Sequence, residues 1–353
     1  MADNSSIEWT DATWNPVRGC SRLSPGCGGA NHQGGCYAEK IAARFSGPGQ
    51  PFEGFAKRTP HGGTWTGKMA VAWDMVDQPI RWRRPRRIFA NSMSDLFHKD
   101  LPRDEVAIIY GTAIAAVHLR GHTFQILTKR ADHMRELLAD EEFWEIANAH
   151  AESLVLEHVD PLARRKNDAR ATLKDYGPDK PPPGIWLGVS VEDQERADER
   201  IPDLLASPAS VRFLSCEPLL GPVDLMEVIP NPLIWSPVHG IERSLDWVIA
   251  GGESGPRARP AHPDWFRSLR DQCATAGVPF FFKQWGEWTP GENVERTKGV
   301  VETATWFGEE WFFDHENLAN DEGHVDDQPD LYRVGKKAAG ARLDGVEHRE
   351  FPT

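Results

Sequence analysis

The amino-acid sequence predicts an α/β protein built on a complete or partial parallel β/α barrel of the TIM-like kind. Short apolar runs recur along the chain, and a polar loop and a helix-like stretch follow each of them, as in βα units. The runs are almost continuously apolar, which favours a sheet that is buried on both faces. With 353 residues, the chain is long enough for one large barrel.

Six segments have the composition of buried strands. They are RRIFANS from Arg86, TFQILTK from Thr123, IWLGVSV from Ile185, VRFLSCE from Val211, LDWVIAGGE from Leu245 and VPFFFKQW from Val278. Helical composition is found at residues 104–119, 131–150, 193–205 and 264–276, with Pro102 and Pro263 placed near two helix starts. Strands and helices therefore alternate along the chain.

We expect the barrel to span residues 1–288, with a cysteine loop at residues 15–40. A charged and then proline-rich insertion at about residues 151–183 is expected to form a helical excursion and a surface loop. Residues 289–353 form an acidic C-terminal extension or lid, with aromatic clusters at Trp306 and at 311–313.

The charge balance excludes some classes of protein. Lys and Arg total 40 against 53 Asp and Glu, and a net charge of −13 argues against a broad basic surface that coats nucleic acid. The basic run RWRRPRR from Arg81 is interpreted as a solvated helix end. Since the chain has no apolar run of membrane-spanning length and starts without a secretory pattern, we expect a cytoplasmic protein with no membrane partner.

Polar side chains lie at or just after the end of each predicted strand. In a β/α barrel these carboxyl ends form the rim of the active site, so the residues are candidates for function. They are Asn91, Lys129, Glu192, Glu217, Glu253 and Lys283.

Three cysteines, Cys20, Cys27 and Cys36, follow the pattern C-x6-C-x8-C in a glycine-rich segment near the N-terminus. Thiolates suit iron-sulfur clusters or zinc, and three of them would leave one iron of a [4Fe-4S] cluster open. Structural zinc normally takes four protein ligands, which His32 would complete, and unliganded thiols are a third interpretation. We do not expect Cys216 or Cys273 to bind the metal.

These residues also resemble a known family. N-P-x-R-G-C and C-Y-A-E resemble the cluster-binding loop of radical S-adenosylmethionine (SAM) enzymes, particularly the branch that resembles spore photoproduct lyase, with Tyr37 as the aromatic after the last cysteine. ANSMSDLF and LTKR resemble later strand ends of that branch. From IEWTDATWNP to FFFKQWG the chain is similar to a phage-associated group, the domain of unknown function 5131 family.

The resemblance implies a partial β/α barrel, a [4Fe-4S] cluster on the three cysteines, SAM on the open iron and an external electron donor. By analogy, it also implies a nucleic-acid base or nucleotide as the substrate. The usual motif is C-x3-C-x2-C, and the spacing here is wider. A zinc-stabilised barrel with a nucleic-acid-associated binding role and no radical chemistry therefore stays open.

Given that cofactor, the strand-end residues receive roles. Asn91, Ser92 and Asp95 are candidates for holding the methionine end of SAM, and capping of the next helix is their alternative role. The glycines of the GGES segment allow close approach of backbone to a ligand. The full set of cofactor-binding candidates is Tyr37, Asn91, Ser92, Asp95, Ser190, Glu192, Gly251, Gly252 and Glu253.

Lys129, Glu217 and Lys283 are the catalytic candidates. The two lysines suit a phosphate or carboxylate, or pair structurally with Glu192 or Glu217. A metal-independent hydrolase that uses Glu217 and Glu253 as its acid and base is a further alternative. Trp285 and Trp288 suit stacking on an adenine or base, although packing is the more common role of such a pair.

Overall fold

The computed structural model describes residues 5–29, 33–60, 62–159, 173–226, 245–294, 299–319 and 329–352. The chain divides into two compact units. The first unit comprises Met1–Leu23, Tyr37–Val189 and Glu199–Phe213, and the second comprises Ser24–Cys36, Ser190–Asp198 and Leu214–Thr353.

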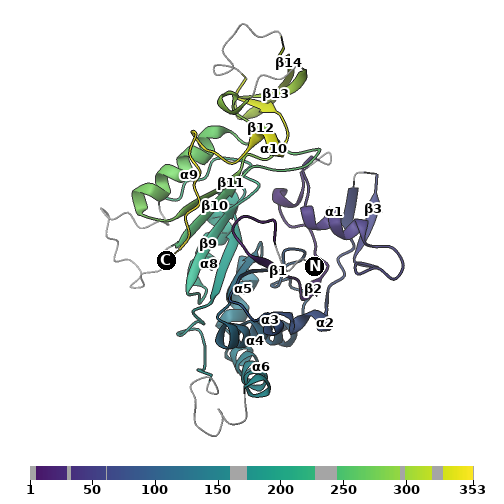
Figure 1. The fold of residues 1–353 in the computed structure, drawn as a ribbon, viewed down its shortest axis with the longest axis vertical. Helices are drawn as coiled ribbons and strands as arrows, with labels where there is room; N and C mark the ends of the chain where they lie inside the picture. The colour runs from purple at the N-terminus through teal and green to yellow at the C-terminus, as the bar shows by residue number, and fades with distance from the viewer. Residues whose placement is uncertain are drawn as a thin grey trace. The chain divides into compact units, whose positions relative to one another are not determined.

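The described strands form a seven-stranded parallel sheet that curls into a half-barrel, in the order β1-β6-β7-β8-β9-β10-β11 (Figure 1). Edge strands β1 and β11 do not pair with each other, so the parallel β/α sheet that the sequence predicts is confirmed in its partial form. The strands are β1 (Ala12–Trp14), β6 (Arg87–Ala90), β7 (Thr123–Thr128), β8 (Ile185–Ser190), β9 (Val211–Cys216), β10 (Trp247–Gly251) and β11 (Phe280–Gln284).

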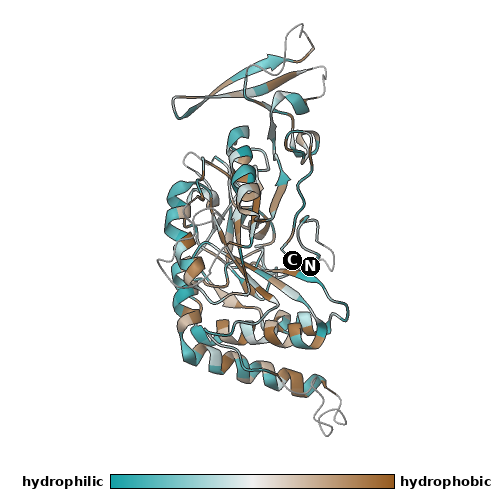
Figure 2. Cartoon of the chain, turned by 90° about the vertical axis from the view of Figure 1, so that its left-hand side faces the viewer, coloured by the Kyte–Doolittle hydropathy of each residue, from teal (hydrophilic) through white to brown (hydrophobic). Residues whose placement is uncertain are grey.

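Six of these strands coincide with the six predicted apolar runs, because burial on both faces leaves little room for polar residues. All five residues of β10 are buried, and four of the five in β11 are buried. In Figure 2 the sheet strands are mostly brown, whereas the helices carry teal residues on their outer faces. Buried apolar residues come from these strands, among them Ile88, Phe124, Leu187, Phe213 and Ile249, and a further core cluster of Ala258, Trp288, Ala304 and Leu331 includes residues of three C-terminal strands, described below.

Five longer helices accompany the strands: α4 (Arg103–Arg120), α5 (Ala131–Ala139), α6 (Glu141–His158), α8 (Gln194–Ala206) and α9 (Pro263–Ala276). The single helix expected at residues 131–150 is two helices. Asp140 has an extended backbone, and its carboxylate accepts a hydrogen bond from the Glu142 amide, which caps α6. Among the described helices, none combines the length and hydropathy that crossing a bilayer requires.

The first unit also holds short elements around the N-terminal segment. Strands β2 (Val17–Arg18) and β5 (Ala70–Val71) pair antiparallel, as do β3 (Ala56–Thr59) and β4 (Gly62–Trp65). Three short helices complete this part: α1 (Tyr37–Arg44), α2 (Trp73–Val76) and α3 (Gln78–Arg81). The expected insertion at residues 151–183 begins inside α6, and its residues 160–172 lie outside the described residues.

The C-terminal part of the second unit forms a separate four-stranded sheet in the order β12-β15-β13-β14. Its elements are β12 (Trp288–Thr289), β13 (Val300–Phe307), β14 (Glu310–Asn317), β15 (Leu331–Arg333) and α10 (Lys336–Ala339). Residues 346–351 then return to the parallel sheet, where the Phe282 amide donates to the His348 carbonyl at 3.0 Å. The region after Trp288 therefore supplies an extra sheet and also covers the edge of β11.

Candidate functional site at the strand ends

In the second unit, residues 24–29 and 33–36 of the described chain carry Cys27 and Cys36. A 3-10 turn spans Pro25–Cys27, and the Cys36 amide donates to the Cys27 carbonyl at 3.3 Å. Cys27 is buried, and Cys36 is half-buried. The backbones of two of the three predicted ligands are thus hydrogen-bonded to each other.

Glu253, just past the end of β10, anchors this loop. Its carboxylate accepts from the Gly35 amide at 3.1 Å and from the Arg259 amide at 2.9 Å. The Arg259 guanidinium adds a bidentate pair, at 2.8 and 2.9 Å, and donates to the Pro25 carbonyl as well. Glu253 is 7% exposed, and both of its carboxylate oxygens accept hydrogen bonds from the loop or from Arg259. A hydrogen bond from a ribose hydroxyl or an amine, which the sequence analysis expected, would have to replace one of these contacts.

Glu192, which follows β8, provides a second anchor. Its carboxylate accepts a hydrogen bond of 2.5 Å from the Ser24 hydroxyl. A Cβ atom at Gly26 would overlap this carboxylate, so only glycine allows the loop to approach so closely. Segment 24–36 is therefore attached to the carboxyl ends of two strands of the sheet.

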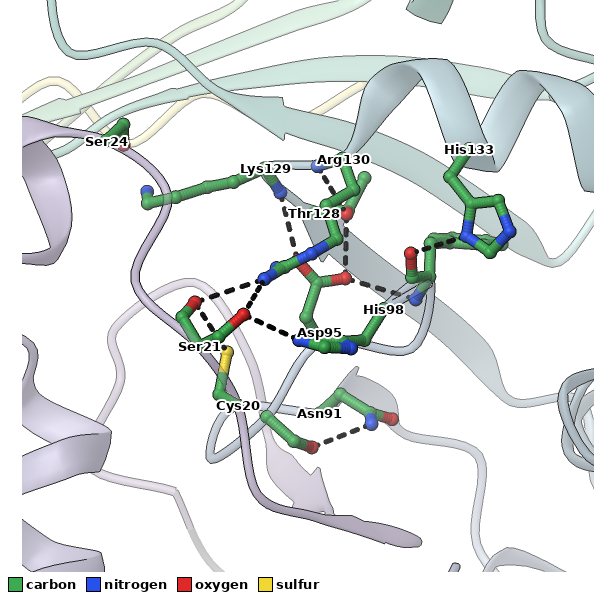
Figure 3. A network of polar contacts seen from close by, with 12 residues as sticks. Cys20, Ser21, Ser24, Asn91, Asp95, His98, Thr128, Lys129, Arg130 and His133 are labelled. Atoms are coloured by element: carbon green, nitrogen blue, oxygen red, sulfur yellow. Dashed lines mark hydrogen bonds and ion pairs between the residues drawn. The ribbon is translucent and has the colours of Figure 1, made fainter. Parts of the chain in front are cut away.

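Cys20 lies in the first unit, beside a network of polar side chains (Figure 3). The Asp95 carboxylate accepts from the Thr128 hydroxyl at 2.7 Å, from the Lys129 amide at 3.2 Å and from the Arg130 guanidinium at 2.8 Å. Asp95 is thus occupied with shaping the end of β7, and its predicted role towards the methionine end of SAM would compete with these bonds.

Arg130 connects Asp95 to the cysteine segment. Its guanidinium donates to the Ser21 carbonyl at 3.1 Å and to the Ser21 hydroxyl at 2.9 Å. Burial lowers the pKa of Arg130, but the charges of Asp95 and Cys20 outweigh this and hold the pKa above its usual value. A guanidinium beside Cys20 favours the thiolate form, the form that binds metals.

His98 also contacts Ser21, but the pair is not arranged as a nucleophile and its base. Its Nε2 lies 2.7 Å from the Ser21 hydroxyl oxygen, while Nδ1 accepts from the Asp100 amide at 3.2 Å. Neutral His98 therefore carries its proton on Nε2 and donates it to Ser21. Burial lowers the pKa of His98, which favours that neutral form.

Asn91 and Ser92 follow β6 in the same unit. Asn91 has a positive φ of 60°, is 2% exposed, and donates through its amide nitrogen to the Ser94 hydroxyl at 2.8 Å. Its Oδ1 is buried and accepts no hydrogen bond from the described residues. Ser92 donates to the Asn15 side chain at 3.2 Å. Asn91 thus presents an acceptor that a ligand donor would satisfy.

Glu217 and Lys283 form an ion pair in the second unit. The Lys283 ammonium donates to both Glu217 oxygens, at 2.9 and 3.0 Å. Nearby, the Gln284 amide donates to the Ser254 hydroxyl at 2.9 Å. This is the structural pairing that the sequence left open for Lys283. Glu217 and Glu253, the acid and base of the hydrolase alternative, are each bound to a cationic side chain.

The remaining candidates are placed as follows. Tyr37 begins α1 and is 70% exposed, whereas Ser190 is buried at the end of β8. Gly251 ends β10 and Gly252 follows it, and a Cβ at Gly252 would overlap the Trp285 carbonyl, so this glycine allows the segments just after β10 and β11 to approach closely. The Lys129 side chain extends away from Asp95 (Figure 3).

Two tryptophans take the packing role. Trp285 and Trp288 are 2% and 3% exposed, and their indole N–H groups donate to the carbonyls of Arg342 and Ala258, both at distances below 3 Å. Buried rings of this kind are not open to a base or adenine.

The predicted metal ligands are the three thiols of the N-terminal segment. Cys20, Cys27 and Cys36 belong to one short segment, whereas burial raises the pKa of Cys216 and raises that of Cys273 to about 12. In the described part of the chain, no three His, Cys, Asp or Glu side chains are gathered as metal ligands. His32, the fourth ligand of the zinc alternative, lies outside the described residues.

Sequence reasoning missed three side chains that organise this region: Ser21, Arg130 and Arg259. Arg130 follows Lys129 at the end of β7, so the strand-end criterion would have found it. Arg259 lies in a loop after β10, and no local pattern marks it.

No curated protein and no solved structure matches the chain. One family matches, over residues 4–352, and its description is "Protein of unknown function (DUF5131)". Because the match covers nearly the whole length, the chain belongs to the DUF5131 family.

Proposed function

We propose that this chain is a radical SAM enzyme that carries a [4Fe-4S] cluster on Cys20, Cys27 and Cys36. The proposal is supported first by the fold, since a parallel half-barrel presents its carboxyl strand ends as a site for cofactor and substrate. It is supported second by sequence: three thiols and no nearby fourth cysteine leave one iron of such a cluster open.

The anchoring of the cysteine loop is the observation that carries the proposal. Glu192 and Glu253 are the residues that follow β8 and β10, and both bind the segment between Ser24 and Cys36. Two buried carboxylates, each of which costs desolvation, are thus committed to fixing this segment at the strand ends, as a cofactor-binding loop requires. The loop is held where barrel enzymes perform their chemistry.

Cys20, Cys27 and Cys36 would hold the cluster, which would supply the one electron for reductive cleavage of SAM to methionine and a 5′-deoxyadenosyl radical. The residues of this chain orient the reacting groups. Arg130 keeps Cys20 beside a positive charge, which favours its thiolate. Asn91 offers the unsatisfied Oδ1 to a donor such as the methionine ammonium. Asp95 positions Arg130.

The substrate that we propose is a nucleic-acid base or nucleotide, as expected from the kinship with spore photoproduct lyase and with phage-associated proteins. An external donor would supply the electron, and the cytoplasm, which is reducing, would suit the thiols. A closed barrel is not part of the proposal, because the half-barrel suffices.

The test is production of 5′-deoxyadenosine by anaerobically reconstituted protein with SAM and a reductant. We expect the product from the natural chain and none from Cys20→Ala, Cys27→Ala or Cys36→Ala. Cys273→Ala is the matched control, since this thiol is buried in α9 and belongs to the core. A colourless protein that holds one zinc ion and forms no product would replace this proposal by the zinc-stabilised binding protein.

A further inference from the structure

A cavity of about 340 Å³ opens in the first unit, and the proposed chemistry does not account for it. Its wall is formed by residues 21–23, by Lys99, by residues 129–133 and by three residues of α8, namely Glu199, Arg200 and Asp203. The volume is at the lower end of the range of small-molecule sites. Every one of these residues belongs to the same compact unit.

The charge of this wall is opposite to that of the whole chain. Acidic residues outnumber Lys and Arg in the sequence, by 53 to 40. In the wall, five side chains carry a fixed positive charge, Arg22, Lys99, Lys129, Arg130 and Arg200, against three carboxylates. Residues outside the wall pair with charges of both signs: Asp203 pairs with Arg135 at 2.7 Å, Arg22 with Glu39 at 2.5 Å and Arg130 with Asp95 at 2.8 Å. Lys99, Lys129 and Arg200 then stand against Asp132 and Glu199. The cavity therefore favours an anion.

Arg130 is a prepared part of this wall. It is 8% exposed, and Asp95 and Ser21 fix its guanidinium by three hydrogen bonds of 2.8 to 3.1 Å. A guanidinium that is already fixed loses little conformational entropy when a ligand binds. Lys99 and Lys129 carry their charges on flexible side chains, which can close over a ligand of more than one charge.

We infer that this cavity binds the phosphate group of a nucleotide. A phosphate carries more charge than a carboxylate and accepts from several donors at once, which suits a wall of arginines and lysines. The inference rests on the proposed function for the role of the ligand as substrate, because the wall includes Ser21, which directly follows Cys20. Phosphate binding itself does not need the cluster.

Isothermal titration calorimetry tests this inference on the full-length chain, with and without reconstituted metal. The titrants are deoxynucleoside 5′-monophosphates, the matching nucleosides and a short single-stranded oligonucleotide. We expect the monophosphates to bind and the double variant Lys99→Gln/Lys129→Gln to weaken their affinity by about tenfold or more. Lys57→Gln, at an exposed lysine of β3 in the same unit, is the control and should bind as the natural chain does.

The comparison of titrants identifies the source of the phosphate. Tighter binding of the monophosphate than of the oligonucleotide supports a free nucleotide, and the reverse order supports a strand whose phosphate enters the cavity. Equal affinity of nucleoside and nucleotide, or equal affinity of the double variant and the natural chain, would overturn the inference. If nucleotides bind to protein that takes up no iron, the inference stands while the radical proposal fails. If 5′-deoxyadenosine forms but nucleotides do not bind, the inference alone fails.

Discussion

Substitution of Glu253 by Gln should loosen the cysteine loop and destabilise the protein. The side chain keeps its shape, but it loses its charge and replaces one acceptor oxygen with an NH2 group. That group cannot accept from Gly35 or from Arg259. Since Glu253 is 7% exposed and Arg259 is 15% exposed, a nearly buried cation loses its counter-charge.

The size of the effect follows from this burial. Breaking one side of a buried, hydrogen-bonded ion pair typically costs about 3 to 5 kcal/mol. Gln retains one acceptor, so we expect a loss of about 3 kcal/mol in the free energy of unfolding. For comparison, Glu302 and Arg333 are 32% and 26% exposed in their 2.6 Å ion pair, and Glu302→Gln should cost less than about 1 kcal/mol.

Urea denaturation gives both free energies, and hydrogen exchange locates the change. In the Glu253→Gln variant the backbone amides of Gly34, Gly35 and Cys36 should exchange faster. These amides donate hydrogen bonds to Arg257, Glu253 and Cys27, and all three bonds depend on the position of the cysteine loop. The reasoning would be refuted if Glu253→Gln cost no more than Glu302→Gln. It would also be refuted if the exchange of these three amides did not change.

Two further predictions concern stability alone. Burial lowers the pKa of His122 in the folded chain below 6.5, its value in the unfolded chain. As the pH falls from 6.5 towards the lower folded pKa, the unfolded chain takes up a proton that the folded chain does not. The free energy of unfolding therefore decreases over this pH range. His122→Asn should reduce this slope by up to about 1.4 kcal/mol per pH unit, measured by urea denaturation from pH 7 to pH 5, and an unchanged slope would contradict the assignment. Gly111→Ala should lower the free energy of unfolding by about 1 to 3 kcal/mol, because the new Cβ would overlap the Ala147 carbonyl where α4 packs on α6. Gly177→Ala, where the space is open, should be nearly neutral in the same thermal or urea assay, and equal effects of the two substitutions would count against the close helix contact.

The parallel sheet could be predicted because its strands are buried on both faces, so each appears in the sequence as a short apolar run. The break between α5 and α6 was not predicted, since residues 131–150 have continuous helical composition and the break depends on the extended backbone of Asp140. Asp is a favoured N-cap residue, so Asp140 was the local signal that marked the start of α6.

The strand-end criterion selected Glu192 and Glu253 as candidates, but it did not indicate what they contact. Glu253 and Gly35 are 218 positions apart, and no local pattern connects them. The sequence also left open whether Lys283 binds a substrate or pairs with Glu217. The structure shows the second alternative, an ion pair of 2.9 Å between Lys283 and Glu217. Partners across a sheet depend on the topology, which composition alone does not specify.

The metal content of anaerobically reconstituted protein tests the central claim most directly. The account predicts a brown protein with about four iron and four sulfide ions per chain. Cys27→Ala should lose most of this content, and Cys273→Ala should retain it. Iron and sulfide that remain bound after substitution of Cys20, Cys27 and Cys36 together would contradict the account, as would stoichiometric zinc in place of iron.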